Sequence, residues 1–295
     1  MTAFPFVTVD VFTDRRFGGN PLAVFSDARG MSEADMQRLA AEFNLSETTF
    51  VLPPADPANT ARVRIFNRTA EMPFAGHPNV GTGYVLAGEG RDKNGVLRFE
   101  ELAGLVEINV DRDGAGAPAG ATIAAPQPLS LGLELPADAV ATCAGLEPSD
   151  VLVREHKPVL ASVGMPFVFA EVAGAALTRA APDLAEFRRT EADWPALKGR
   201  LALHLYARDG ARIRARMFAP LSGTLEDPAT GSANATLGAL LLSLTRESSA
   251  TYEIVQGVEM GRPSLLRVAA RRAPDGVRAT VGGGCVPVLR GEALV

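Results

Sequence analysis

Two segments of the chain predict helices that are apolar on nearly every side. One follows Gly76, and the other follows Gly231 and continues as Ser-Ala-Asn-Ala-Thr-Leu-Gly-Ala-Leu-Leu-Leu. A helix without a polar face belongs inside a protein. A strand-like stretch and a sharp turn precede each segment. We therefore expect two buried central helices, each with a buried N-terminus.

The residues before the two helices follow one pattern. In each copy an acidic residue and a proline precede a glycine, and a polar side chain follows it: Glu71, Pro73, Gly76 and His77 in one, Glu226, Pro228, Gly231 and Ser232 in the other. The glycines are 231 − 76 = 155 positions apart in a chain of 295 residues. Self-similarity at about half the chain length predicts two related lobes.

The buried start of each helix is a candidate anion site. A buried helix N-terminus leaves backbone N–H groups unpaired and carries a partial positive charge, which suits a carboxylate or phosphate. In the second copy Asp227 lies just upstream of the turn. If the two N-termini faced each other, one carboxylate would touch Gly76 and His77 on one side and Gly231 and Ser232 on the other. The alternative is that both turns are tight helix entries satisfied by water or caps.

Alternation of polar and apolar residues predicts the strands of the sheets. The expected strands are residues 7–12, 48–52, 62–66, 104–110, 159–162, 167–171 and 201–206, and residues 17–25 are expected to form a turn that leads into the second strand of a hairpin. The arginines of residues 62–66 are expected to face solvent, and His204 is expected in the core. Further helices are predicted at residues 136–144 and 184–188, and a strand, a turn and a returning strand at residues 256–264.

Another helix is predicted between Ser32 and Asn44. Ser32 is the expected N-cap and Asp35 its capping-box partner. The buried stripe of this helix consists of Met36, Leu39, Ala40 and Phe43. The Gly/Ala/Pro-rich residues 114–120 suggest the lobe boundary. We expect an N-terminal lobe at residues 1–116 and a C-terminal lobe at residues 117–283, with the strand near residues 284–295 as a candidate for completing the first lobe.

Five motifs resemble the PhzF phenazine-biosynthesis family along nearly the whole chain. They are residues 46–51 (Ser-Glu-Thr-Thr-Phe-Val), 73–78 (Pro-Phe-Ala-Gly-His-Pro), 217–220 (Met-Phe-Ala-Pro), 226–233 (Glu-Asp-Pro-Ala-Thr-Gly-Ser-Ala) and 256–264 (Gln-Gly-x-x-Met-Gly-Arg-Pro-Ser). The resemblance implies an α+β fold shared with diaminopimelate epimerase. It has two pseudo-symmetric lobes, each a curved, mostly antiparallel β-sheet around a central helix, with a cofactor-free site between them.

Glu47 is the expected catalytic acid/base. A glutamate at a helix-to-strand junction is by itself usually a solvated surface group, but this one matches the general acid/base of the PhzF motif. His77 lies between Gly76 and Pro78 at a helix start, where a neutral imidazole could donate to a bound acid or carry its proton. Asn20, in Gly19-Asn20-Pro21, could serve the site or only the turn, so it is not counted among the site residues.

The resemblance implies a cofactor-independent isomerase. It would move a proton within a small cyclic amino or hydroxy carboxylic acid, as the family's namesake does with trans-2,3-dihydro-3-hydroxyanthranilate. Glu47 would act as acid/base, and Gly76, His77, Asp227, Gly231 and Ser232 would bind the substrate. The physiological substrate is left open.

Two rival functions are an epimerase or racemase on the same scaffold, and a family member that binds a metabolite without converting it. Epimerases of the diaminopimelate type use a cysteine on each face of the substrate. The two cysteines here, Cys143 and Cys285, lie outside the glycine turns, which disfavours that chemistry. Glu47 argues against a binding-only role.

The amino-acid composition disfavours some classes of binding partner. The net charge is −5 and no long basic run occurs, which disfavours nucleic acid and membrane surfaces. Gly81-Thr82-Gly83 lacks the third glycine of a dinucleotide fingerprint, because residue 86 is leucine. No nicotinamide or metal signature is present, so we expect no cofactor or metal. The resemblance further implies a small-molecule carboxylate as substrate, and we expect a cytoplasmic location and a homodimer.

Overall fold

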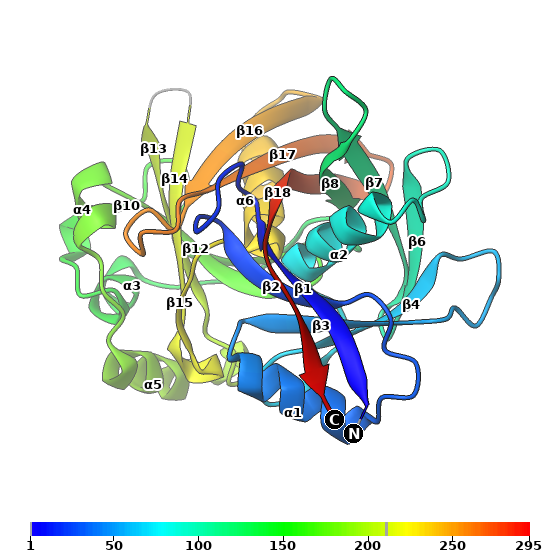
Figure 1. Cartoon of the computed structure of the whole chain (residues 1–295). Coiled ribbons are helices and arrows are strands. Elements are labelled where there is room, and N and C mark those ends of the chain that lie inside the picture. The colour runs from blue at the N-terminus through cyan, green and yellow to red at the C-terminus, as the bar shows by residue number, and fades with distance from the viewer. Residues whose placement is uncertain (1, 210–211) are drawn as a thin grey trace. The chain divides into compact units, whose positions relative to one another are not determined.

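The computed structural model describes residues 2–209 and 212–295. These residues form two units, of which unit 1 comprises Met1–Ala124 with Gly282–Val295 and unit 2 comprises Ala125–Val281. Each unit combines one curved sheet with helices (Figure 1). The long final strand β18 (Gly276–Leu294) contributes its first residues to unit 2 and the rest to unit 1.

Unit 1 wraps its sheet around the central helix α2 (Gly76–Gly88). Its other elements are β1 (Ala3–Val11), β2 (Asn20–Phe25), α1 (Glu33–Phe43), β3 (Glu47–Leu52), β4 (Ala61–Phe66), β5 (Glu71–Met72), β6 (Val96–Glu101), β7 (Gly104–Arg112) and β8 (Pro118–Ala124). The strands pair in the order β1–β2–β3–β4–β6–β7–β8. Because β18 pairs with both β8 and β1, the sheet closes on itself.

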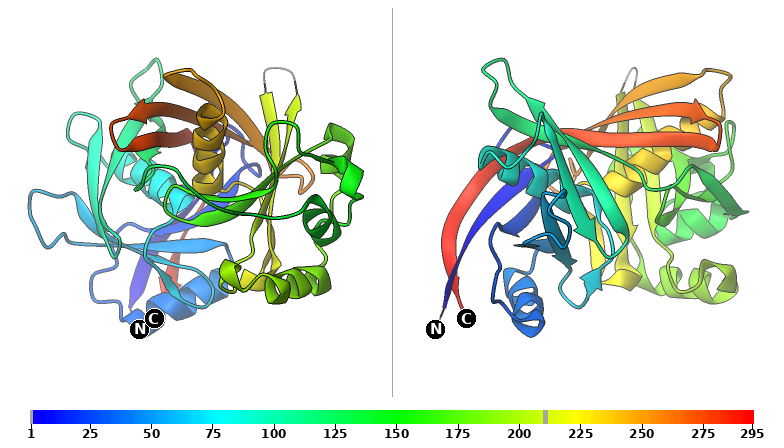
Figure 2. Two further views of the ribbon diagram at one scale, coloured as in Figure 1. Left: turned by 180° about the vertical axis from the view of Figure 1, so that it is seen from behind. Right: turned by 90° about the vertical axis from the view of Figure 1, so that its right-hand side faces the viewer.

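The C-terminal part of β18 runs antiparallel beside β1, and the two chain ends lie side by side (Figure 2). Backbone hydrogen bonds join Thr2 and Val295 in both directions, at 2.7 and 3.0 Å. The last strand of the chain therefore belongs to the sheet of unit 1.

Unit 2 wraps its sheet around the central helix α6 (Gly231–Ser243). Its other strands and helices are β9 (Ser130–Glu134), α3 (Ala137–Cys143), β10 (Val151–Leu152), β11 (Val159–Ser162), β12 (Pro166–Val172), α4 (Gly174–Arg179), α5 (Leu184–Asp193), β13 (Leu203–Asp209), β14 (Arg212–Ala219), β15 (Thr224–Asp227), β16 (Ser249–Gln256) and β17 (Ser264–Ala273). Three short 3₁₀ helices occupy Pro148–Asp150, Pro195–Leu197 and Pro220–Ser222.

The two units repeat one topology. Parallel pair β2–β3 is connected through α1, and β12–β13 through α4 and α5. Parallel pair β4–β6 is connected through β5 and α2, and β14–β16 through β15 and α6. The glycines that start the central helices keep their spacing of 155, as do Asn79 and Asn234 in the first turns. The expectation of two related lobes in an α+β fold, each a sheet around a central helix, is confirmed.

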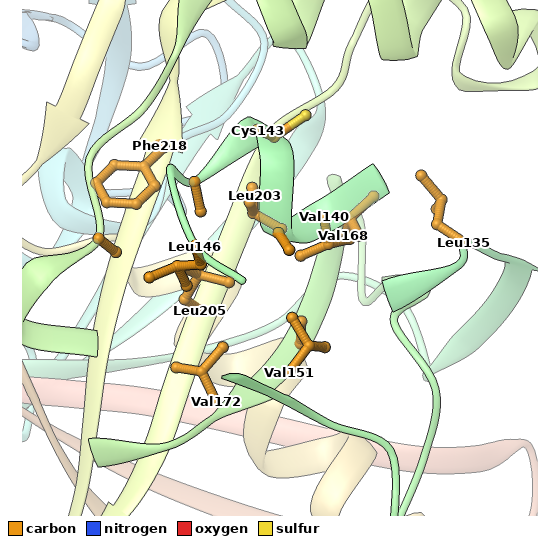
Figure 3. Close-up of a cluster of buried hydrophobic side chains, with 14 of the residues drawn as sticks. Leu135, Val140, Cys143, Leu146, Val151, Val168, Val172, Leu203, Leu205 and Phe218 are labelled. Carbon is orange, nitrogen blue, oxygen red and sulfur yellow. The ribbon is translucent and has the colours of Figure 1, made fainter. Parts of the chain in front are cut away.

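Each unit contains a cluster of buried apolar side chains. In unit 1, Phe25 stacks on Phe50, and Phe50 meets Phe66 edge to face, beneath α1. In unit 2, side chains from α3, α4, α5 and strands β12 to β14 form one cluster around Leu205 and Phe218 (Figure 3). Complete burial of one such side chain stabilises the fold by about 1.5–3 kcal/mol.

Most predicted elements are confirmed, including the Ser32 cap and the buried stripe of α1. The residue 62–66 strand is confirmed too, but its arginines do not both face solvent. Arg64 is only 13% exposed because Glu71 pairs with it and Phe66 lies under its guanidinium. Of the Gly/Ala/Pro-rich residues 114–120 expected at the lobe boundary, 114–117 lie in the turn between β7 and β8 and 118–120 begin β8, and unit 1 continues to Ala124.

Candidate active site

Glu47, His77 and Asn20 meet at the start of α2. His77 is the second residue of that helix, whereas Glu47 and Asn20 are the first residues of β3 and β2. His77 Nδ1 lies 3.4 Å from Glu47 Oε2 and 3.4 Å from Asn20 Nδ2. His77 is 5% exposed and Asn20 is fully buried, while the Glu47 side chain keeps 18% exposure. A carboxyl group with access to solvent thus faces a buried imidazole.

The His77 ring is neutral. Burial lowers the pKa of His77 to about 3, and a hydrogen bond to the Pro21 backbone opposes this only in part. The contact with Glu47 therefore joins a carboxyl group to an uncharged imidazole, although its distance would also suit an ion pair. A nitrogen of a neutral imidazole donates in one tautomer and accepts in the other, so His77 can hydrogen-bond to the Glu47 carboxyl group in either charge state of that group.

The chain on both sides fixes the Glu47 backbone. Helix α1 is capped at its C-terminus by Asn44, which takes the left-handed conformation (φ 52°) and donates its backbone N–H to the Ala41 carbonyl. The chain then enters β3 at once, where Glu47 is paired with Leu22 of β2 in the parallel ladder. Such constraint limits the movement of the carboxyl group, as proton transfer requires.

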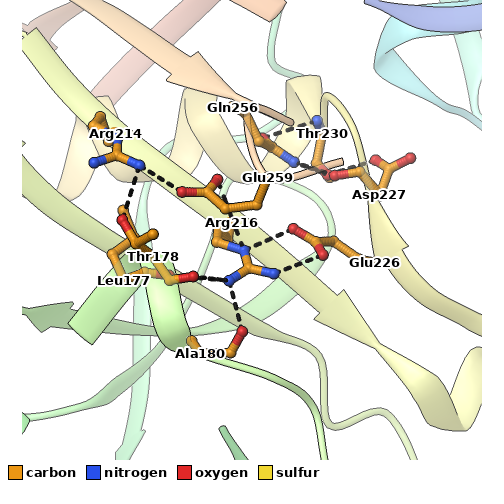
Figure 4. A network of polar contacts seen from close by, with 10 residues as sticks. All are labelled: Leu177, Thr178, Ala180, Arg214, Arg216, Glu226, Asp227, Thr230, Gln256 and Glu259. Atoms are coloured by element: carbon orange, nitrogen blue, oxygen red, sulfur yellow. Dashed lines mark hydrogen bonds and ion pairs between the residues drawn. The ribbon is translucent and has the colours of Figure 1, made fainter. Parts of the chain in front are cut away.

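At the start of α6, polar side chains are tied together (Figure 4). Asp227 is 7% exposed, and its Oδ2 accepts a 2.5 Å hydrogen bond from Thr230 Oγ1. Gln256, at the end of β16, donates from Nε2 to the Asp227 carbonyl at 2.7 Å. Its Oε1 accepts from Asn234 Nδ2 at 2.7 Å. Gln256 thereby joins the strand end to the first turn of the helix.

Buried ion pairs support the segments before both turns. Arg216 donates to both carboxylate oxygens of Glu226 at 2.8 Å, and its Nη1 donates to the carbonyls of Leu177 and Ala180 (Figure 4). In unit 1 Arg64 pairs with Glu71 in the same way. Both arginines also lie over a phenylalanine ring two residues on. The acidic residues of the repeated sequence pattern are thus structural.

Neither central helix is capped by the side chain of its N-cap residue, Ala75 in α2 and Thr230 in α6. Asn79 and Asn234 instead bind the carbonyls of Ala75 and Thr230 at 3.0 Å and hold the turns in shape. Backbone N–H groups of a helix start that no side chain caps favour a bound anion.

The structure brings three predicted site residues of unit 1 together: Glu47, Gly76 and His77. In unit 2 it places Asp227 on the strand before the turn and Gly231 and Ser232 in the first turn of α6. Asn20 was left open by the sequence and lies against His77. The sequence feature that could have pointed to Asn20 is the preceding Gly19. Only glycine fits there, because φ is 63° and a Cβ would lie 2.3 Å from the Val11 carbonyl oxygen. The sequence predicts only a structural role for Gln256, in the strand, turn and returning strand of residues 256–264.

A family model described as "Phenazine biosynthesis-like protein" matches residues 9–291. The chain belongs to the PhzF family. Its PhzF relatives include a trans-2,3-dihydro-3-hydroxyanthranilate isomerase of Pseudomonas aeruginosa, which is 37% identical over 98% of this chain and 99% of its own. An uncharacterized isomerase of Mesorhizobium japonicum is 35% identical over 98% of both chains.

A solved PhzF-family structure from Bacillus anthracis matches 100% of both chains with a TM-score of 0.88 and 25% identity. The PhzF relatives and the shared fold identify this protein as an isomerase. In the part of the chain that the structure describes, no helix has the length and apolar character needed to span a membrane. Within those same residues, no three His, Cys, Asp or Glu side chains form a metal-binding group.

Proposed function

We propose that this PhzF-family protein is a cofactor-independent isomerase that shifts a proton within a small cyclic amino or hydroxy carboxylic acid. The observation that carries the proposal is the contact between the partly exposed Glu47 carboxyl group and the neutral, buried His77. The name of the Pseudomonas aeruginosa relative supports a substrate related to trans-2,3-dihydro-3-hydroxyanthranilate.

In the proposed reaction, Glu47 takes a proton from one ring carbon. The electron pair left behind moves through the conjugated system, and a proton returns to another carbon, so that substrate and product have the same composition. His77 keeps the Glu47 carboxyl group in place and exchanges hydrogen bonds with it as its charge changes. An enzyme without a cofactor can accelerate such a proton shift by positioning the substrate and by general acid/base catalysis. General acid/base catalysis typically raises the rate ~100-fold or more.

We assign substrate binding to both helix starts. The proposed carboxylate-binding groups are the backbone N–H at Gly76 in unit 1, and the backbone N–H at Gly231 with the Ser232 hydroxyl in unit 2, since neither N-cap side chain caps its helix. His77 and Asp227 are proposed to bind the amino or hydroxyl substituents. The Thr230 hydrogen bond orients the Asp227 carboxylate for this role.

Both cysteines are poor candidates for a thiol-based epimerase. Cys143 lies in the α3 core of unit 2, and Cys285 is paired with Val11 in the sheet of unit 1. Burial raises the pKa of both thiols, so that they stay protonated and weakly reactive. Carboxyl chemistry at Glu47 is therefore favoured over a pair of thiols.

Replacing Glu47 tests the proposal. Glu47→Gln keeps the shape and most hydrogen bonds but removes the transferable proton, so we expect kcat to fall ~100-fold or more. The matched control is Glu42→Gln, which removes an exposed carboxylate from α1 and is expected to leave kcat unchanged. Turnover of an accepted cyclic acid should be followed for both variants, with thermal unfolding as the check on folding. Near wild-type turnover by Glu47→Gln would show that another group carries the proton.

A further inference from the structure

Glu101 is a buried carboxyl group that the proposed mechanism does not use. It is the last residue of β6, and both of its carboxyl oxygens are shielded from solvent. The side chain lines a pocket of about 250 Å³ that lies wholly within unit 1. A buried charge without partners is costly, so its protonation state needs an explanation.

The internal repeat supplies a reference for this position. Glu101 and Gln256 are 256 − 101 = 155 residues apart, the same spacing that relates Gly76 to Gly231 and Asn79 to Asn234. Each ends the strand that follows its central helix and is parallel to the strand before it. Glu101 is also close enough to the Asn79 amide for that amide to act on its carboxyl group, as Gln256 is bonded to Asn234.

Gln256 uses both ends of its amide. The oxygen accepts from Asn234 Nδ2, and the nitrogen donates to the Asp227 carbonyl and, at 3.2 Å, to Thr230 Oγ1. An ionised carboxylate can only accept, whereas a protonated carboxyl group has one donor and an acceptor. Only the protonated form of Glu101 can therefore reproduce the two-way contact.

The surroundings of Glu101 favour the protonated form. Burial raises the pKa of Glu101 to about 8, and the Asn79 amide opposes this only in part. The charged groups that line the same pocket are Arg62 and Arg64 of β4, Glu71 of β5 and Glu100 of β6. Arg64 pairs with Glu71, and Glu100 accepts hydrogen bonds from Asn59 and two backbone N–H groups. Arg62 is exposed.

We propose that Glu101 is a positioning residue that works in its protonated form. Its neutral carboxyl group joins the end of β6 to the first turn of α2, as Gln256 does for α6, and so holds Gly76 and His77 in place. The inference rests on the proposed function, in which this turn carries substrate-binding groups. It also predicts a decline in activity at alkaline pH, because ionisation of Glu101 removes the donor that its own carboxyl group supplies to the contact.

Glu101→Gln is the decisive variant because it supplies a donor at every pH. We expect kcat/KM within ~2-fold of wild type at neutral pH, and loss of the alkaline decline that we expect for wild type above about pH 8. Glu101→Ala, which has neither donor nor acceptor, is expected to raise KM at all pH values. An unchanged alkaline decline in Glu101→Gln would overturn the positioning role.

A structural readout separates this inference from the proposed reaction. The folded-state pKa lies above the unfolded value of 4.5, so wild type should lose stability relative to Glu101→Gln as pH rises from about 4.5 to 8, and no further above it. Wild type should also show the infrared band of a protonated carboxyl group at neutral pH, which Glu101→Gln lacks.

Glu100→Gln is the control. Hydrogen bonds from Asn59 and the backbone lower the pKa of Glu100, so its contribution to stability is lost only as pH falls below 4.5. This variant should keep the infrared band and show no added pH dependence between about pH 5 and 9. If Glu101→Gln failed to fold, or kept the band and the wild-type stability profile, the inference would be refuted while the assignment of Glu47 would stand.

Discussion

The starts of α2 and α6 have the same backbone construction but different side-chain chemistry. Both helices begin at a glycine, and in neither does the side chain of the N-cap residue cap the helix. In both, an asparagine in the first turn donates to the carbonyl of the N-cap residue. Around α6 the polar side chains Asp227, Thr230 and Gln256 satisfy one another. Around α2 a neutral histidine faces a carboxyl group. In the function proposed here, both turns bind substrate, and only the side chains at the start of α2 also transfer a proton.

The buried arginines offer the largest test of this comparison. Arg216 is 7% exposed and donates to Glu226 and to two backbone carbonyls, whereas Arg64 is 13% exposed and shares its bonds with the exposed Glu33. Arg216→Met leaves Glu226 buried without its partner, which costs about 3–5 kcal/mol of unfolding free energy. Arg64→Met is expected to cost about 1.5–3 kcal/mol, the usual range for hydrogen bonds to a charged group.

Urea unfolding measures both losses. Arg98→Met is the control, because Arg98 and its partner Glu107 are each about half exposed and such pairs contribute ~0–1 kcal/mol. An Arg64→Met loss equal to or larger than that of Arg216→Met would show that the two ion pairs do not differ as their burial indicates.

Substitution of glycines inside the central helices should give the next largest change in the free energy of unfolding. A Cβ on Gly238 would lie 2.4 Å from Val268 Cγ1, and one on Gly83 would lie 2.7 Å from Ile108 Cγ2. Overpacking typically costs ~1–3 kcal/mol, and the gain of about 1 kcal/mol in helix propensity offsets part of it. We expect Gly238→Ala to destabilise more than Gly83→Ala in urea unfolding. Stabilisation by Gly238→Ala would mean that α6 can move away from β17 without cost.

Two buried histidines, one in each unit, should be equally sensitive to acid but unequal in catalysis. Burial lowers the pKa of both His77 and His204 to about 3. Because the unfolded chain takes up these protons first, near pH 6.5, stability falls as pH falls towards 3. Each histidine should contribute about 1.4 kcal/mol per pH unit in that window.

Urea unfolding of His77→Gln and His204→Gln between about pH 5 and 7 measures this slope against wild type. Both variants should lose the acid sensitivity of the replaced histidine. His77→Gln is expected to lower kcat more than His204→Gln, because His77 contacts Glu47 whereas His204 reaches the start of α6 only through Asn234. Equal effects on kcat would remove the catalytic distinction between the two buried rings.

The sequence predicts what depends on local pattern. The apolar helices, their glycine starts and the 155-residue spacing were sufficient to predict two related lobes, and the motif around Glu47 identified the acid/base candidate. The position of Asn44 between α1 and β3 also follows from local signals, because a left-handed cap after a helix favours asparagine.

Features that depend on distant segments were missed. Arg64 looks like a solvent-facing residue of an alternating strand, but Glu71 and Phe66 cover it. Asn20 lies in β2 and Gln256 lies in β16, and the sheets bring these strand ends to the helix starts. No local sequence pattern reveals this placement. The burial of Glu101 is likewise a property of the closed sheet rather than of its neighbours in sequence.

The most direct test of the account follows the transferred proton. Wild-type enzyme acting in D₂O on an accepted cyclic acid should form product with deuterium at the carbon that gains the proton, as measured by NMR. The rate at which Glu47→Gln forms that labelled product should be lower than the wild-type rate by a factor of ~100 or more, while the fold of the variant is retained. Product formation and labelling by Glu47→Gln at a near wild-type rate would contradict the central claim that Glu47, held beside His77, carries the proton.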